Sequence, residues 1–158
     1  MTSPEAALRT TEQIRDGLAA EIALARNERV LIRKMDVDGL NLRAAKRAEF
    51  NQRTAELQST LAAQLADVGR GFGIAEITLE ALKVKDPAFG WRMSQLLAEV
   101  RSLASALSEL DSLNRMLGQR ALTYVRAHLA VLTPKLSAYD RRGGSAAATR
   151  ASTHVRVV

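Results

Sequence analysis

The chain has 158 residues, a formal net charge of +6 and no cysteine. The missing thiols exclude a disulfide framework, a cysteine nucleophile and a thiolate metal site. Aromatic residues make up only 4% of the chain, while alanine and leucine are abundant, a composition that favours close helix–helix packing over a β-sandwich. We therefore predict one all-α domain, the usual outcome for a chain of this length.

Residues 1–5 do not resemble a signal peptide, because no basic flank precedes an apolar core. No stretch approaches the length of apolar sequence that a membrane-spanning helix needs. We therefore expect a cytoplasmic protein with no membrane span.

The positive charge is concentrated in the tail. After Asp140 the chain carries four arginines and no acidic residue, and the preceding 140 residues hold 19 basic and 17 acidic side chains. A folded nucleic-acid-binding domain gathers its basic residues on one face, often with aromatic stacking partners. Neither feature is evident, so we expect no nucleic-acid partner.

The first predicted helix covers residues 4–34. Ser3, Pro4 and Glu5 form a helix start, because they offer a capping hydroxyl, a preset φ and an acid near the positive end of the dipole. The core stripe of this helix lies within about 80° on a helical wheel. It consists of Ala7, Ile14, Leu18, Ile22, Ala25 and Ile32.

Residues 35–39 interrupt the helical pattern. Asp36, Asp38 and Gly39 provide capping side chains and a permissive backbone, which predict a tight reversal or kink. The same aspartates resemble the opening of a calcium-binding loop, but the closing glutamate is absent. We therefore interpret them as helix caps.

The second predicted helix covers residues 40–68. Its second half has an apolar side formed by Phe50, Thr54, Leu57, Leu61, Leu65 and Val68. We interpret the basic cluster of its first half as a solvated helix face near the open end of the bundle, more exposed and more mobile than the rest. That cluster is Arg43, Lys46, Arg47 and Arg53.

Three alternating glycines in residues 69–73 are expected to end the second helix. A short helix is predicted over 75–83, closed by Pro87. We expect Phe72, Phe89 and Trp91 to fill the closed end of the bundle.

A long helix is predicted over residues 91–139. Its seam recurs at steps of three and four residues, through Leu96, Val100, Leu103, Leu107, Leu110, Asn114, Leu117, Ala121, Tyr124, His128 and Val131. A second apolar set lies beside this seam, at Leu122, Val125, Leu129, Leu132 and Leu136. Together the two sets widen the apolar face to roughly 180°. Either this helix is buried between two neighbours in its own fold, or it offers a docking face to an amphipathic helix of another protein.

The chain lacks the residue patterns of an enzyme or a metal site. Its two histidines, His128 and His154, are isolated, and no Glu-x-x-His pair is present. No cluster joins a nucleophile to an orienting base. We expect no catalytic residue, metal or cofactor. The predicted architecture is an elongated antiparallel helical hairpin or three-helix bundle over 1–140, with a long C-terminal helix and a flexible, disordered basic tail over 141–158.

The order and spacing of three stretches carry a resemblance to a known family. They are RNERVLI at 26–32, followed by Asp36 and Asp38; KRAEF at 46–50, leading to Leu57; and LNRML at 113–117, followed by a leucine-rich run to Pro134, then Tyr139 and the glycine pair at 143–144. This pattern resembles the FlgN family of flagellar export chaperones over about residues 5–144.

The resemblance implies that the chain holds hook-associated flagellar proteins and delivers them to the flagellar type III export gate. Asn114 matches the family's helix asparagine, and Tyr139 matches a tyrosine that would contact the gate. The expected partner-binding residues are Asn114, Leu117, Leu122, Val125, Leu129, Leu132 and Leu136. The alternatives are a structural coiled-coil homodimer and, less favoured by the nearly neutral body, a small nucleoid-associated protein.

Overall fold

The computed structural model describes residues 4–132, which divide into two units between Gln119 and Arg120. The helices are α1 (Pro4–Lys34), α2 (Val37–Phe72), α3 (Leu79–Lys85) and α4 (Pro87–Leu132). None of the residues in 4–132 lies in a strand. The all-α prediction is confirmed. The predicted basic tail and the domain boundary at residue 140 lie outside the described residues.

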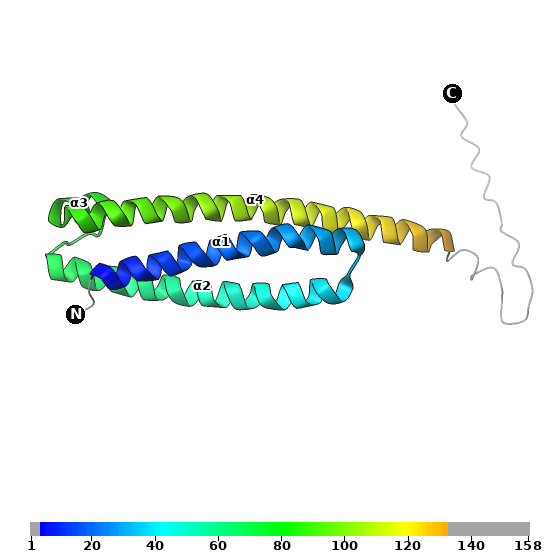
Figure 1. The fold of residues 1–158 in the computed structure, drawn as a ribbon, viewed down its shortest axis with the longest axis horizontal. Helices are drawn as coiled ribbons and strands as arrows, with labels where there is room; N and C mark the ends of the chain where they lie inside the picture. Colours follow the sequence, from blue (N-terminus) through cyan, green and yellow to red (C-terminus); the bar gives the residue numbers. More distant parts are fainter. Residues whose placement is uncertain (1–3, 133–158) are drawn as a thin grey trace, which may run out of the picture. The chain divides into compact units, whose positions relative to one another are not determined.

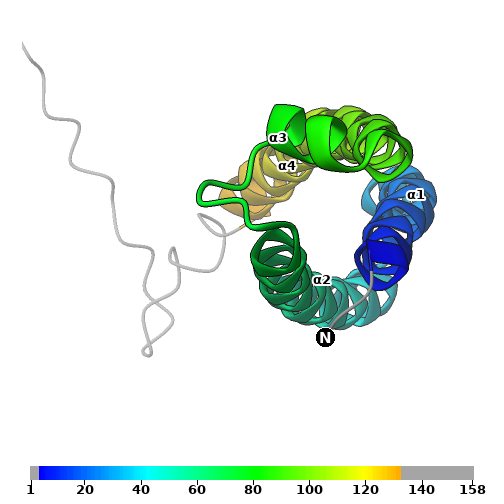
Figure 2. The ribbon, with the colours of Figure 1, turned by 90° about the vertical axis from the view of Figure 1, so that its left-hand side faces the viewer.

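In the first unit, α1, α2 and the part of α4 up to Gln119 run side by side as a three-helix bundle (Figures 1 and 2). Every member of the stripe predicted for α1 is buried, because its residues recur on one face of the helix. The other helices bury Leu61, Val68, Leu82, Phe89, Met93, Leu96 and Leu107.

A tight turn joins α1 to α2. Met35 has a positive φ of 52°, and Asp36 caps the next helix by accepting a hydrogen bond from the Gly39 N–H at Oδ1 over 2.9 Å. The interpretation of this aspartate as a cap is therefore confirmed. The cap lets α2 begin at Val37, three residues before the expected start.

Helix α2 extends into the glycine-rich stretch at residues 69–73 before it ends. The helix continues through Phe72, and Gly73 adopts a left-handed conformation with φ 65°. The Gly73 N–H donates to the Arg70 carbonyl and the Ile74 N–H donates to the Gly69 carbonyl at 2.9 Å. These two bonds form a Schellman motif, which satisfies carbonyls that the helix end would leave unpaired.

The short helix α3 and the start of α4 are both fixed by side-chain caps. Thr78 accepts a hydrogen bond from the Ala81 N–H at 3.1 Å, so residues 75–78 precede the helix instead of belonging to it. Asp86 accepts from the Phe89 N–H at 3.0 Å, and Pro87 occupies the first turn. As a result α4 begins four residues before the expected position.

Two of the three aromatic residues expected at the closed end do pack there. Phe89 is buried and Phe72 is partly buried against the core. Trp91 is instead 60% exposed, and the Lys83 ammonium lies 4.4 Å from the centre of its ring. The expectation that Trp91 fills the interior is therefore wrong. Its indole takes part in a surface cation–π contact.

No helix within residues 4–132 is long and apolar enough to cross a membrane.

Candidate partner-binding surface

Residues 120–132 of α4 are helical throughout and carry several large apolar side chains that are exposed. Leu122 and Leu129 are each 57% exposed, Val125 is 38% exposed and Leu132 is 63% exposed. These four residues follow one another at steps of three and four, so they share one side of the helix. We call Leu122, Val125, Leu129 and Leu132 the apolar face.

The seam residues Tyr124, His128 and Val131 are exposed as well, and they widen this surface. The rings of Tyr124 and His128 contact each other, with their centres 4.2 Å apart. His128 Nδ1 lies 3.2 Å from the Tyr124 carbonyl oxygen. A hydrogen bond between these two atoms requires the proton on Nδ1, since a carbonyl oxygen only accepts.

The two remaining expected contact residues within the description, Asn114 and Leu117, belong to the first unit and are less accessible. Leu117 is half-buried. Asn114 is only 4% exposed, and its amide Nδ2 donates to the Ala25 carbonyl oxygen at 2.8 Å. The Arg29 guanidinium donates through Nε to Asn114 Oδ1 at 3.2 Å. The amide is thus used to join α4 to α1.

A buried ion-pair network connects the three long helices of the first unit. Glu21 of α1 is 2% exposed and accepts hydrogen bonds from Arg43 and Arg47 of α2, the latter at 2.7 Å. Arg47 also pairs with Asp111 of α4. Glu28 lies 3.4 Å from Arg43 Nε. Burial alone lowers the pKa of Arg47, but hydrogen bonds to Asp111 and Glu21 outweigh it and raise the pKa above its ordinary value.

The network corrects the interpretation of the basic cluster of α2 as a solvated face for Arg43 and Arg47, whereas Lys46 and Arg53 are exposed as expected. Arg43 is only 6% exposed, and Arg47 is partly buried. The sequence did contain a signal for this. Glu21 lies three residues after Leu18 and four before Ala25, on the core side of α1, while Arg43 and Arg47 continue the side of α2 that carries Phe50. Charged residues on two facing seams indicate a buried pair.

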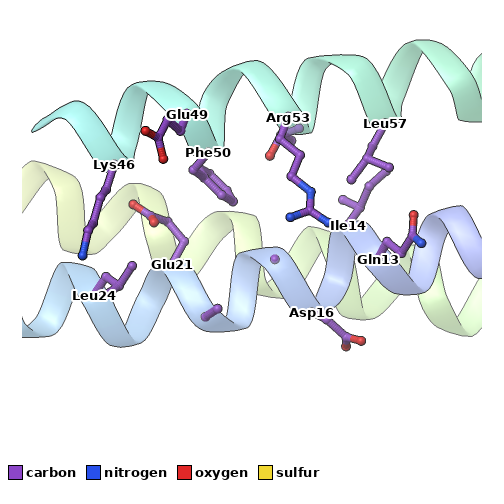
Figure 3. A pocket seen from close by; sticks show the side chains of 13 residues that line it. Gln13, Ile14, Asp16, Glu21, Leu24, Lys46, Glu49, Phe50, Arg53 and Leu57 are labelled. Atoms are coloured by element: carbon purple, nitrogen blue, oxygen red, sulfur yellow. The ribbon is translucent and has the colours of Figure 1, made fainter. Parts of the chain in front are cut away.

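A groove of about 580 Å³ lies between α1 and α2 (Figure 3). Ile14, Phe50 and Leu57 provide apolar lining, and Phe50 is directed toward α1, where a side chain at Gly17 would meet its ring edge at 3.8 Å. The charged residues at the groove are Asp16, Glu21, Lys46, Glu49 and Arg53. The lining contains no histidine, serine or cysteine.

Among residues 4–132, no group of three or more histidine, aspartate or glutamate side chains could hold a metal ion. The expected contact residues Leu136 and Tyr139 lie outside the described residues.

Comparison with protein families gives one match that covers most of the chain. The family model described as FlgN protein matches residues 1–147. Searches of curated proteins and of solved structures gave no significant match.

Proposed function

The chain belongs to the FlgN family of flagellar export chaperones, and from this premise we propose that it holds the amphipathic helical end of hook-associated flagellar proteins on its apolar face. In this proposal the chaperone acts in the cytoplasm and delivers its cargo to the flagellar type III export apparatus. It acts by binding and needs no catalytic residue or cofactor.

The observation that supports this proposal is the exposure of four large apolar side chains on one side of a helix. Leu122, Val125, Leu129 and Leu132 span about three turns, a length of roughly 15 Å, and all are exposed. An amphipathic helix recognises such a surface through apolar side chains at the same three- and four-residue spacing. Covering the surface also removes apolar area from water, which stabilises the complex.

The proposal assigns different roles to the two ends of the expected site. Leu136 continues the spacing of the apolar face and would extend the contact by one turn. Tyr139, through the family resemblance, would contact the export gate. Replacing Tyr139 by alanine should then leave cargo affinity unchanged and lower export of the cargo, while a phenylalanine replacement tests whether the hydroxyl matters.

The central experiment replaces two residues of the apolar face by aspartate, Val125→Asp with Leu129→Asp. A matched control, Ala127→Asp with Ala130→Asp, adds the same charges to the same turns on the opposite side of the helix. Burying each large side chain stabilises a complex by about 1.5–3 kcal/mol. The first variant should therefore bind a purified hook-associated protein about 100-fold more weakly or worse.

The control variant should bind within about threefold of the unchanged chain, a difference below 1 kcal/mol. Circular dichroism should show unchanged helicity for both variants, because all four positions are exposed. Retention of the cargo at unchanged affinity by Val125→Asp with Leu129→Asp would overturn the proposal.

A further inference from the structure

Arginines stand at both edges of the exposed apolar surface. Arg126 follows Leu122 by four residues and precedes Leu129 by three, which places it about 40° from one edge. Arg120 precedes Tyr124 by four residues and is about 20° from Val131 around the axis. Both arginines are exposed.

Neither arginine has a carboxylate partner among residues 4–132, whereas Arg15, Arg43, Arg47, Arg70 and Arg92 of the first unit each form an ion pair with an aspartate or glutamate. The described part of the chain gives Arg120 and Arg126 no such pair, because no acidic residue occurs between Asp111 and the end of α4.

The whole sequence shows the same division of charge. Residues 1–111 carry 15 basic and 16 acidic side chains, whereas residues 112–158 carry eight basic side chains and a single acidic one, Asp140. The excess positive charge of the chain therefore lies entirely in the stretch that contains the apolar face. A partner that binds to this stretch meets a positive electrostatic potential, which favours partners with a negatively charged binding surface.

We propose, building on the function proposed above, that the segment held on the apolar face is an amphipathic helix with acidic side chains along both edges of its apolar stripe. Its apolar residues cover the apolar face together with Tyr124, His128 and Val131, so its edge carboxylates meet Arg126 beside Leu122 and Arg120 beside Val131. The charges contribute to the choice of partner and to the rate of encounter, whereas the apolar contact supplies most of the affinity.

The same charges disfavour a second copy of this chain as the occupant. When two identical helices pair antiparallel, like edges meet, so Arg126 opposes Arg126. When they pair parallel, opposite edges meet, so Arg126 opposes Arg120. Both arrangements bring arginines together without any acidic residue of the same stretch to offset them.

An anionic membrane surface is the other ligand that suits a basic, amphipathic helix. Helices that lie on membranes usually have a strongly charged polar side opposite their apolar side. Here the opposite side carries Thr123, Ala127 and Ala130, so the positive charge is confined to the edges. That arrangement fits the edges of a partner helix better than a layer of phosphate groups.

The test uses the full-length chain and three designed helical peptides of about 18 residues, long enough to span the face. All three peptides share one leucine stripe, and their edge positions carry glutamate, glutamine or lysine. Vesicles of phosphatidylglycerol with phosphatidylcholine form a fourth arm. Binding is measured by fluorescence anisotropy, or by co-sedimentation for vesicles, at about 50 and about 500 mM NaCl, since the higher salt shortens the screening length severalfold.

The glutamate peptide should bind about tenfold more tightly than the glutamine peptide at low salt, the lysine peptide should bind most weakly, and high salt should reduce these differences to about threefold or less. Arg120→Glu with Arg126→Glu should reverse the order of the peptides. Arg9→Glu with Arg101→Glu makes the same change in net charge at exposed positions of the first unit and should preserve the order.

Equal binding of the three peptides would overturn the acidic-edge inference and leave the apolar docking face intact. Absence of binding by every peptide would overturn the docking face itself, together with this inference. Tighter binding to vesicles than to the glutamate peptide, lost in Arg120→Glu with Arg126→Glu, would identify a membrane surface as the ligand instead.

Discussion

The side-chain amide of Asn114 in α4 donates a hydrogen bond to the carbonyl oxygen of Ala25 in α1 over 2.8 Å. Both residues are buried: Ala25 is 0% exposed and Asn114 is 4% exposed. The family resemblance places this asparagine among the expected partner-binding residues. In the bundle it makes a buried polar contact that fixes how α4 lies along α1.

Replacing Asn114 by leucine should destabilise the first unit without weakening cargo binding. Leucine has a similar volume but cannot donate to Ala25 or accept from Arg29. The loss of both bonds should lower the free energy of unfolding by about 1–3 kcal/mol, measured by urea unfolding. The exposed Asn51→Leu is the control and should change it by less than about 0.5 kcal/mol. Weaker cargo binding with unchanged stability would mean that Asn114 contacts the partner.

Glu21 forms a second buried polar contact inside the bundle. Replacing Glu21 should lower the free energy of unfolding by more than Asn114→Leu does. Replacing Glu21 by glutamine removes the most buried carboxylate paired with Arg43 and leaves it only Glu28, 3.4 Å from its Nε, so the loss should approach the value of about 3–5 kcal/mol that is typical of breaking a buried ion pair. Thermal and urea unfolding followed by circular dichroism measure the effect. Glu56→Gln, on the exposed side of α2, is the matched control.

A double replacement distinguishes two causes of instability in Glu21→Gln: the loss of the charged partner of Arg43 and a general loss of packing. Glu21→Leu with Arg43→Leu removes both charges and should recover most of the stability lost in Glu21→Gln, because an apolar pair of similar volume often replaces a buried ion pair at little cost. If the double variant is as unstable as the single one, the destabilisation does not arise from the uncompensated charge of Arg43.

Most of the fold could be predicted from the sequence because its helices have one apolar side each. The stripe from Ala7 to Ile32 was predicted completely, since period and burial coincide along α1. The ends of the helices were less certain because they depend on individual capping groups. Asp86 starts α4 earlier and Gly73 ends α2 later than the apolar periodicity indicates.

The site was predicted less well, for two physical reasons. An exposed apolar set and a set buried between two neighbours have the same periodicity, so the pattern at Leu122 and Leu129 could not decide between them. In addition, a charged residue on the seam of one helix is buried only if the facing helix has a residue of opposite charge at the same height along the helix axis. Arg43 meets Glu21 in this way, and helix periodicity alone does not give the relative register of two helices.

Two glycines of the first unit should respond to alanine in opposite directions. At Gly90 an added Cβ would lie 2.5 Å from the Lys83 backbone nitrogen, so α3 and α4 approach too closely for a side chain. Gly90→Ala should cost about 1–3 kcal/mol through overpacking. At Gly118 an added Cβ meets no atom within 4 Å, and Gly118→Ala should stabilise α4 by about 0.5–1 kcal/mol.

Urea unfolding of both alanine variants checks this prediction. The opposite signs matter more than the magnitudes, because both substitutions raise helix propensity by the same amount. Equal stabilisation by Gly90→Ala and Gly118→Ala would show that the contact between Lys83 and Gly90 is not closely packed in solution.

Arg120 and Arg126, at the two edges of the exposed apolar surface, should also keep the chain from pairing with itself. At low salt, sedimentation equilibrium should find a monomer at micromolar concentration, because a second copy would place Arg120 and Arg126 against like charges. Arg120→Gln with Arg126→Gln removes this repulsion and leaves the apolar side chains in place, so it should strengthen self-association by about tenfold. A tight dimer of the unchanged chain at low salt, lost in Val125→Asp with Leu129→Asp, would contradict this prediction. It would assign the apolar face to a structural homodimer, since the same side chains cannot cover each other and hold a cargo helix.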